Sequence, residues 1–152
     1  MKRPFLLSSL ILVGCSTSPL SYSGVTPRSA SDGYTCAMQQ MNGLGYTVED
    51  ADRDAGFIRG TKQTSGLGTA IFFGKKYHDL MTVVVFDGVE GTTTMRVTAG
   101  QVEESGVLIP LIGNTTAKKP TDDGIADAHE LLAQCGVPEA NIRLGMIRSD
   151  VG

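Results

Sequence analysis

The amino-acid sequence predicts a small α+β domain, in which an antiparallel sheet of about four strands carries two helices on one face. Apolar residues recur at helical spacing in two segments, one before and one after the region that is rich in β-branched residues. That region contains two pairs of strand-like runs, and each pair is joined by a turn with glycine and aspartate. Cys36 and Cys135 lie in the two helical segments and suit a disulfide between them.

The first helix is expected to follow Ser31 and Asp32, whose side-chain oxygens suit an N-cap. Gly43 and Gly45 supply its stop signal. Its apolar face is formed by residues three, four, seven and ten positions apart, namely Tyr34, Ala37, Met38, Met41 and Leu44.

Four strands are expected next, arranged as two antiparallel hairpins. The first hairpin pairs residues 46–48 with 57–62, and the second pairs residues 77–86 with 92–102. The second helix begins after Pro120, with Thr121 as its N-cap, and ends at Gly136. One face of it carries Ile125, Ala128, His129, Leu132 and Cys135. Residues 142–146 alternate weakly, which leaves a short final strand open.

The first fourteen residues have the features of a secretory signal peptide. Lys2 and Arg3 precede an apolar stretch that is too short to span a bilayer. The ending Leu12-Val13-Gly14-Cys15 resembles the bacterial lipobox, and this resemblance implies cleavage before Cys15 and lipid on its thiol. An ordinary signal peptide with an incidental cysteine is the alternative. By the same resemblance, Ser16 in place of Asp favours the periplasmic side of an outer membrane over an inner or cell membrane.

Three segments follow from these patterns: a signal peptide at 1–14, a flexible lipid-anchored tether at 15–31, and an α+β domain at 32–152. The tether is expected because its Ser, Pro and Gly content cannot build a core. In an oxidising compartment, Cys36 and Cys135 predict one disulfide, and two buried free thiols are the alternative. If the helices lie side by side, the disulfide requires them to run antiparallel.

The mature chain is acidic, which narrows the classes of partner. The sequence has 13 basic and 16 acidic residues, and loss of Lys2 and Arg3 leaves 11 basic residues and a formal charge of −5. Basic residues form no cluster larger than the pairs Lys75-Lys76 and Lys118-Lys119. This distribution argues against a nucleic-acid partner and against attraction to anionic lipid by charge.

A second resemblance involves Leu44-Gly45-Tyr46-Thr47-Val48, followed by Asp52 and by Gly56 and Ile58, directly after an amphipathic helix. This segment of about thirty residues is similar to a pattern in small envelope lipoproteins. Their domains resemble the helix-grip domains of the C subunit of the outer-membrane β-barrel assembly machine. The resemblance implies a binding or scaffolding domain and carries over no functional residue.

Two segments resemble known metal-binding and phosphate-binding motifs but do not match them fully. Asp50, Asp52 and Asp54 have the spacing that opens an EF-hand loop, but Ala55 and Thr61 occupy its glycine and glutamate positions, so a hairpin turn is expected. The spacing from Gly68 to Gly74-Lys75 does not match a phosphate loop.

The two histidines do not suggest a catalytic site either. His78 and Asp79 are neighbours on a strand and therefore point to opposite faces, while His129 shares an apolar stripe. We expect no metal, no cofactor and no enzymatic activity.

Two apolar segments stand between glycines in the connections. One contains Ile71, Phe72 and Phe73, and the other contains Leu108, Ile109 and Leu111. Such segments suit partner binding, and the alternative is that they fold back over the sheet. The function expected from the sequence is a lipid-anchored, non-enzymatic binding or scaffolding module for envelope proteins. A carrier of a small apolar ligand is the alternative, and an envelope hydrolase is a weaker one.

Overall fold

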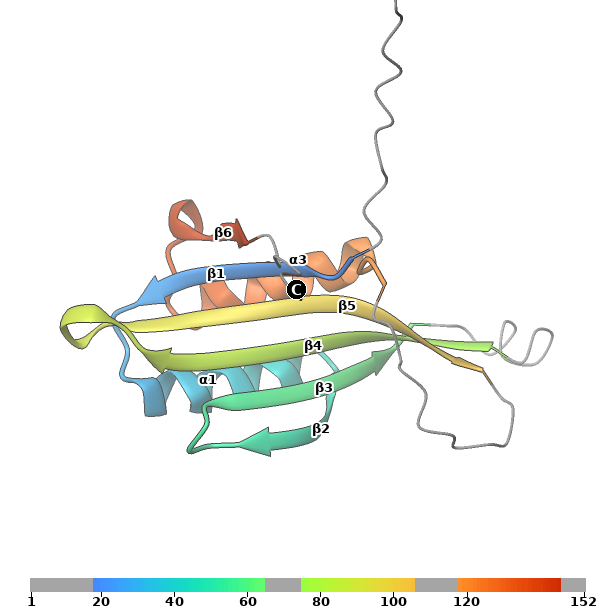
Figure 1. Ribbon diagram of the computed structural model, residues 1–152, viewed down its shortest axis with the longest axis horizontal. Coiled ribbons are helices and arrows are strands. Elements are labelled where there is room, and N and C mark those ends of the chain that lie inside the picture. Colours follow the sequence, from blue (N-terminus) through green and yellow to red (C-terminus); the bar gives the residue numbers. More distant parts are fainter. Residues whose placement is uncertain (1–17, 65–74, 106–117, 146–152) are drawn as a thin grey trace, which may run out of the picture.

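The fold is seen in a computed structural model that describes residues 18–64, 75–105 and 118–145. Figure 1 shows the strands as one twisted sheet with the helices behind it. Single 3-10 turns, η1 (Val89–Gly91) and η2 (Glu139–Asn141), join some of the elements. The helices and strands are, in chain order, β1 (Leu20–Thr26), α1 (Ala30–Gly43), β2 (Thr47–Asp52), β3 (Phe57–Gln63), β4 (Lys75–Asp87), β5 (Thr93–Ser105), α3 (Asp122–Gln134) and β6 (Arg143–Gly145).

The sheet has six strands in the order β2-β3-β4-β5-β1-β6, and all neighbours are antiparallel. The predicted class, α+β with two helices and an antiparallel sheet, is confirmed. The prediction of about four strands is too small. Both predicted hairpins are present as β2–β3 and β4–β5, and the additional strands β1 and β6 extend the sheet beyond β5.

Strand β1 corrects the predicted tether at residues 15–31. Residues 20–26 pair with β5 over their whole length, so the tether prediction is wrong from Leu20 onward; residues 15–17 lie outside the described part. The Ser- and Gly-rich composition has a packing reason in this strand. Tyr22 is buried against the helices, and a Cβ at Gly24 would lie 2.2 Å from Cγ1 of Val137. The weakly alternating C-terminal segment forms β6, which pairs with β1.

The first helix begins slightly earlier than predicted. Its N-cap is Ser29, whose hydroxyl oxygen accepts a 3.2 Å hydrogen bond from the backbone N–H of Asp32, so neither Ser31 nor Asp32 is the cap. Its end agrees with the prediction, because Gly45 has a φ of +86°, a conformation that favours glycine. For α3, the predicted cap Thr121 is confirmed, and Gly136 follows the helix with a φ of +88°.

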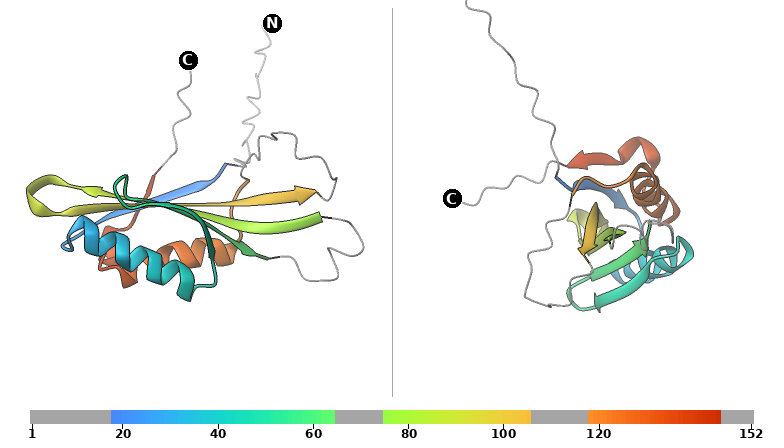
Figure 2. Two further views of the ribbon diagram at one scale, coloured as in Figure 1. Left: turned by 90° about the horizontal axis from the view of Figure 1, so that it is seen from below. Right: turned by 90° about the vertical axis from the view of Figure 1, so that its right-hand side faces the viewer.

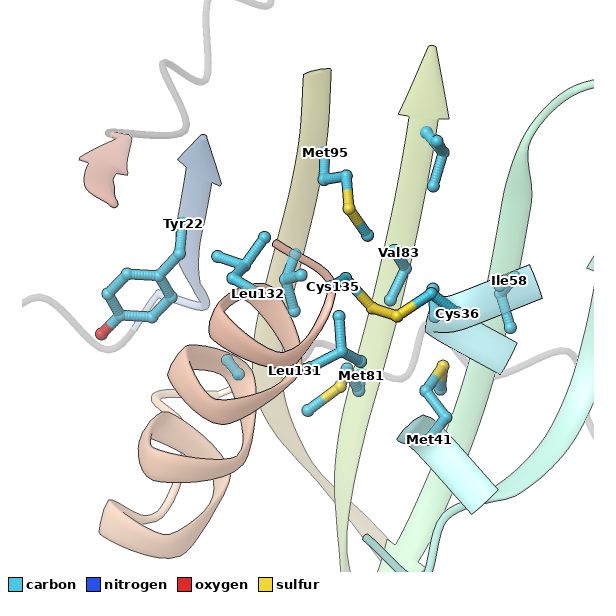
Figure 3. Packing of buried hydrophobic residues seen from close by; sticks show 14 of the residues in the cluster. Tyr22, Cys36, Met41, Ile58, Met81, Val83, Met95, Leu131, Leu132 and Cys135 are labelled. Carbon is cyan, nitrogen blue, oxygen red and sulfur yellow. A yellow bond between two sulfur atoms is a disulfide. The ribbon is translucent and has the colours of Figure 1, made fainter. Parts of the chain in front are cut away.

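Both helices lie on the same face of the sheet, side by side and in opposite directions (Figure 2). The predicted disulfide joins them: Cys36 and Cys135 have Cα atoms 5.7 Å apart. Figure 3 shows this bond in the middle of the layer between helices and sheet. The side chains around it are almost entirely apolar, and the most buried of them are Met41, Ile58, Met81, Val83, Met95, Val97, Leu131 and Leu132.

The two edges of the sheet are poorly suited to pairing with another strand. On one edge, β2 exposes the acidic residues Glu49, Asp50 and Asp52. On the other edge, β6 is only three residues long. Charged and very short edge strands discourage further strand addition, so binding is better sought on faces and ends of the domain.

Candidate functional site

The residues that the sequence singled out for lipid attachment and partner binding lie outside the described residues. These are Cys15 and the two apolar groups, Ile71, Phe72, Phe73 and Leu108, Ile109, Leu111. The structure does place the points where the chain enters and leaves these groups. Thr64 donates its N–H to the Tyr77 carbonyl, Lys75 pairs with Ser105, and Lys118 bridges to Gln101. Both connections therefore start and finish at one end of the sheet.

The histidines are placed as expected from strand and helix periodicity. Asp79 is buried under the helices, whereas His78 lies on the opposite face of β4. His129 is half-buried on α3 and meets the Tyr22 ring edge-on, with a centroid distance of 4.5 Å. The sheet therefore separates His78 from Asp79, and His129 packs against Tyr22 of β1.

The acidic group at Asp50, Asp52 and Asp54 forms part of the β2–β3 hairpin. The Asp52 carboxylate accepts hydrogen bonds of 2.9 and 3.0 Å from the N–H groups of Asp54 and Ala55. Such a bond pattern closes a turn. Across the described residues, no group of three or more acidic, histidine or cysteine side chains is arranged to hold a metal ion.

A buried polar cluster occupies the space between β4 and the start of α3. Asp79 is only 1% exposed, and its Oδ2 accepts a 2.5 Å hydrogen bond from the hydroxyl of Thr121. Its other oxygen, Oδ1, has no hydrogen-bonding partner in the described part of the chain. Burial raises the pKa of the Asp79 carboxyl, and the Thr121 hydrogen bond partly offsets this rise.

Tyr46 and an ion pair complete this cluster. The Tyr46 hydroxyl is buried, and its pKa is raised by burial and by the nearby charge of Asp127. Lys62 forms a 2.7 Å ion pair with Asp127 and also lies over the Tyr46 ring, 5.5 Å from its centroid. The cluster ties β3 and β4 to α3, and its Asp79 and Tyr46 side chains are buried, so we interpret it as a structural feature.

An accessible hollow of about 280 Å³ lies at the opposite end of the sheet from the two apolar connections. Three elements meet around it: the first turns of α1, the β2–β3 turn and the end of β4. Its lining is half apolar and half polar, with Tyr34, Arg53 and Phe86 as the largest side chains.

Arg53 is held in a fixed position beside this hollow. Its guanidinium lies 5.0 Å from the centre of the Tyr34 ring. Its two terminal nitrogens donate to the hydroxyls of Ser31 at 3.2 Å and Thr35 at 3.3 Å. Arginine has five N–H donors, so three remain for other partners. A stacked, oriented arginine next to tyrosine is the kind of pair that dominates binding energy in protein interfaces.

Exposed apolar side chains gather near the same end. Phe86 and Val25 are 41% and 45% exposed and lie on one face, separated by Thr94. Val89, in the β4–β5 turn, is 81% exposed. Leu144 on β6 is the one large exposed apolar residue of the described chain that lies elsewhere.

The face of the sheet away from the helices carries three exposed arginines. They are Arg59 on β3, Arg96 on β5 and Arg143 on β6. Side chains alternate between the two faces along each strand, and the register pairs these arginines with half-buried or exposed residues and not with core residues. None of the three forms an ion pair with any residue that the structure describes.

Sequence reasoning did not find the hollow, because its walls come from segments far apart in the chain. The sequence predicts Tyr34 on the apolar face of the first helix, where it is buried, and Arg53 lies between Asp52 and Asp54 in the expected hairpin turn. The local signal is limited to an arginine within a predicted turn and Phe86 at the end of the predicted strand 77–86.

Comparison with known proteins gives no relative: no protein-family model and no curated protein sequence matches this chain. Within the described ranges, no helix is long and apolar enough to cross a membrane.

Proposed function

We propose that this protein is a lipid-anchored binding module on the periplasmic side of a bacterial membrane, and that it holds an envelope protein at the hollow beside Tyr34 and Arg53. The observation that carries the partner site is the oriented guanidinium of Arg53, stacked on Tyr34 at the rim of an open hollow. Aromatic residues and arginine are enriched at protein interfaces, and the exposed Val89 adds apolar area nearby. A scaffolding role is also what the resemblance to helix-grip domains implies.

The size of the hollow favours a protein over a small apolar ligand. Pockets for small molecules usually measure about 300–1,000 Å³ and enclose most of the ligand. This hollow, at about 280 Å³, is open and half polar, which suits one side chain of a protein partner. Native mass spectrometry of the extracted protein distinguishes the alternatives, because a carrier retains a small molecule.

The test of the partner site uses two exposed alanines. Ala55 lines the hollow, whereas Ala133 lies on α3 away from it. A photo-crosslinking residue at position 55 is expected to give one discrete protein adduct in intact cells, and the same residue at position 133 is not. In a second experiment the photo-crosslinking residue is placed at position 89. Ala55→Arg should then abolish the protein adduct formed through position 89, whereas Ala133→Arg should not change it. Equal adducts at 55 and 133, or loss with both arginine variants, contradict the proposal.

The anchor is proposed from the lipobox resemblance at Leu12-Val13-Gly14-Cys15, with the outer membrane favoured by Ser16. Several acyl chains make such attachment effectively permanent, whereas one alone is marginal. Globomycin or Cys15→Ser should block maturation, and intact mass should show acyl groups on Cys15 in the untreated protein. A mature protein that begins at Met1, or that lacks the acyl mass, contradicts the anchor.

The two apolar connections are proposed as a second contact with the partner. Replacement of Phe72, Phe73, Leu108 and Leu111 by serine should weaken partner capture and leave the free energy of unfolding nearly unchanged. Unfolding of this variant would show that the four residues belong to the core and would contradict the proposed second contact.

A further inference from the structure

We propose that the face of the sheet away from the helices rests on phospholipid headgroups, which Arg59, Arg96 and Arg143 contact through lipid phosphates. This inference relies on the proposed lipid anchor and adds the surface of the domain that faces the membrane.

The first support is the short distance between the anchor and the fold. Ser18 is the first described residue and lies three positions after Cys15. A fully extended chain of that length covers about 10 Å. Because β1 begins at Leu20, this short connection keeps the start of β1, and with it this part of the sheet, close to the bilayer.

The second support is the position of β1 within the sheet. β1 pairs with β5 on one side and with β6 on the other, so the anchored chain enters the sheet between the strands that carry Arg96 and Arg143. With one strand between them, these two arginines lie about 10 Å apart. Ser23 is their common neighbour in register.

The third support is the separation of charge between the two layers. The helices carry five acidic residues, Asp32 on α1 and Asp122, Asp123, Asp127 and Glu130 on α3, and contain no lysine or arginine. The opposite face carries the three arginines and Lys76. The acidic side chains that the structure places on that face lie on the edge strand β2: Asp50, which is in register with Arg59, Asp52, and Glu49, which accepts a hydrogen bond from Thr61.

This asymmetry orients the domain although its formal charge after cleavage is negative. An anionic surface attracts nearby arginines and repels the acidic helices, so the sheet face turns toward the lipid. Arginine side chains also extend their apolar stems over the surface while the guanidinium reaches phosphate. Phe57, Val84 and Phe86 on the same face supply apolar contact at the headgroup boundary. Sequence reasoning excluded attraction to anionic lipid because these arginines are far apart in the chain.

The test uses the complete, acylated protein in vesicles of phosphatidylethanolamine and phosphatidylglycerol that contain a lipid-borne fluorescence quencher. A fluorophore on Thr82→Cys, on the sheet face, should be quenched, and one on Gln39→Cys, on α1, should not. Equal quenching at both positions, or stronger quenching at 39, overturns the proposal. The acyl mass on Cys15 is measured on the same sample, so that loss of the anchor is recognised separately.

A charge-matched pair of variants isolates the arginines. Arg96→Gln with Arg143→Gln should lower the sheet-facing population about fivefold per arginine, and high salt should have the same effect. Arg28→Gln with Lys119→Gln removes two exposed charges elsewhere and should change nothing. If position 82 is shielded from an aqueous quencher in isolated envelopes but not in pure lipid vesicles, a protein covers this face and the lipid assignment is wrong.

Discussion

The hydroxyl of Thr121 links two elements at once: it accepts the Gly124 N–H at the start of α3 and donates to the buried carboxylate of Asp79 on β4. The helix cap and the buried acid are therefore one unit, and each stabilises the geometry of the other. This unit lies at the end of the domain where the sheet meets the start of α3.

Asp79 should make stability depend on pH. Its pKa lies above the ordinary value near 3.8 because the carboxyl is buried, so the protonated form favours the folded state. That stabilisation is fully present below the unfolded pKa and is lost as pH rises through the folded pKa. Asp79→Asn keeps an acceptor for Thr121 and removes the ionisation. Urea unfolding should show that the free energy of unfolding of the variant rises relative to that of the wild type as pH increases from acidic to neutral. A difference between the two proteins that stays constant with pH contradicts this.

Thr121→Val should destabilise the protein by about 2–3 kcal/mol, because it removes the helix cap and leaves the Asp79 carboxylate without its donor. Ser29→Ala removes only the exposed cap of α1 and should cost about 1 kcal/mol. Chemical unfolding measures both. Equal losses would show that the Asp79 contact contributes nothing.

Gly56→Ala should be the more damaging of two glycine substitutions in turns. Gly56 and Gly91 both have positive φ, +65° and +76°, so alanine is strained at either position by about 1–2 kcal/mol. Only at Gly56 would the new Cβ also meet backbone, 2.0 Å from the Val85 carbonyl oxygen; at Gly91 nothing lies within 4 Å. The melting temperature of Gly56→Ala should therefore be well below that of Gly91→Ala, and similar melting temperatures contradict the predicted clash.

Reduction of the Cys36–Cys135 bond should lower the free energy of unfolding by about 2–4 kcal/mol. The bond joins residues 99 positions apart and therefore restricts a large part of the unfolded chain. Denaturant titrations with and without reductant measure the effect. As a control, a thiol reagent on denatured, unreduced protein should label neither cysteine. Labelling of both would show that the disulfide is not formed.

Local patterns predicted the elements whose signals are contained in one segment. Thr121 precedes an apolar helical stripe and is the cap of α3, and the glycines after both helices have the positive φ that ends them. The two hairpins follow from β-branched runs on either side of a turn. The pairing of the cysteines followed from their number and their place on the two helices.

Features that depend on contacts between distant parts of the chain could not be predicted from the sequence. β1 has the composition of a linker, and its inward Gly24 makes sense only beside Val137. Asp79 was considered only with its neighbour His78, whereas its actual partner Thr121 is 42 positions away. The hollow and the arginine face have the same origin, because each is assembled from several strands or helices.

The place of β1 in the sheet also constrains the order in which the sheet can be completed. Its two neighbours are β5 and β6, the last two strands of the described chain. Because a chain is synthesised from its N-terminus, β1 is made long before either of its partners. The first strand therefore stays unpaired until most of the described chain is present, and its pairing with β6 needs the C-terminal end of that chain.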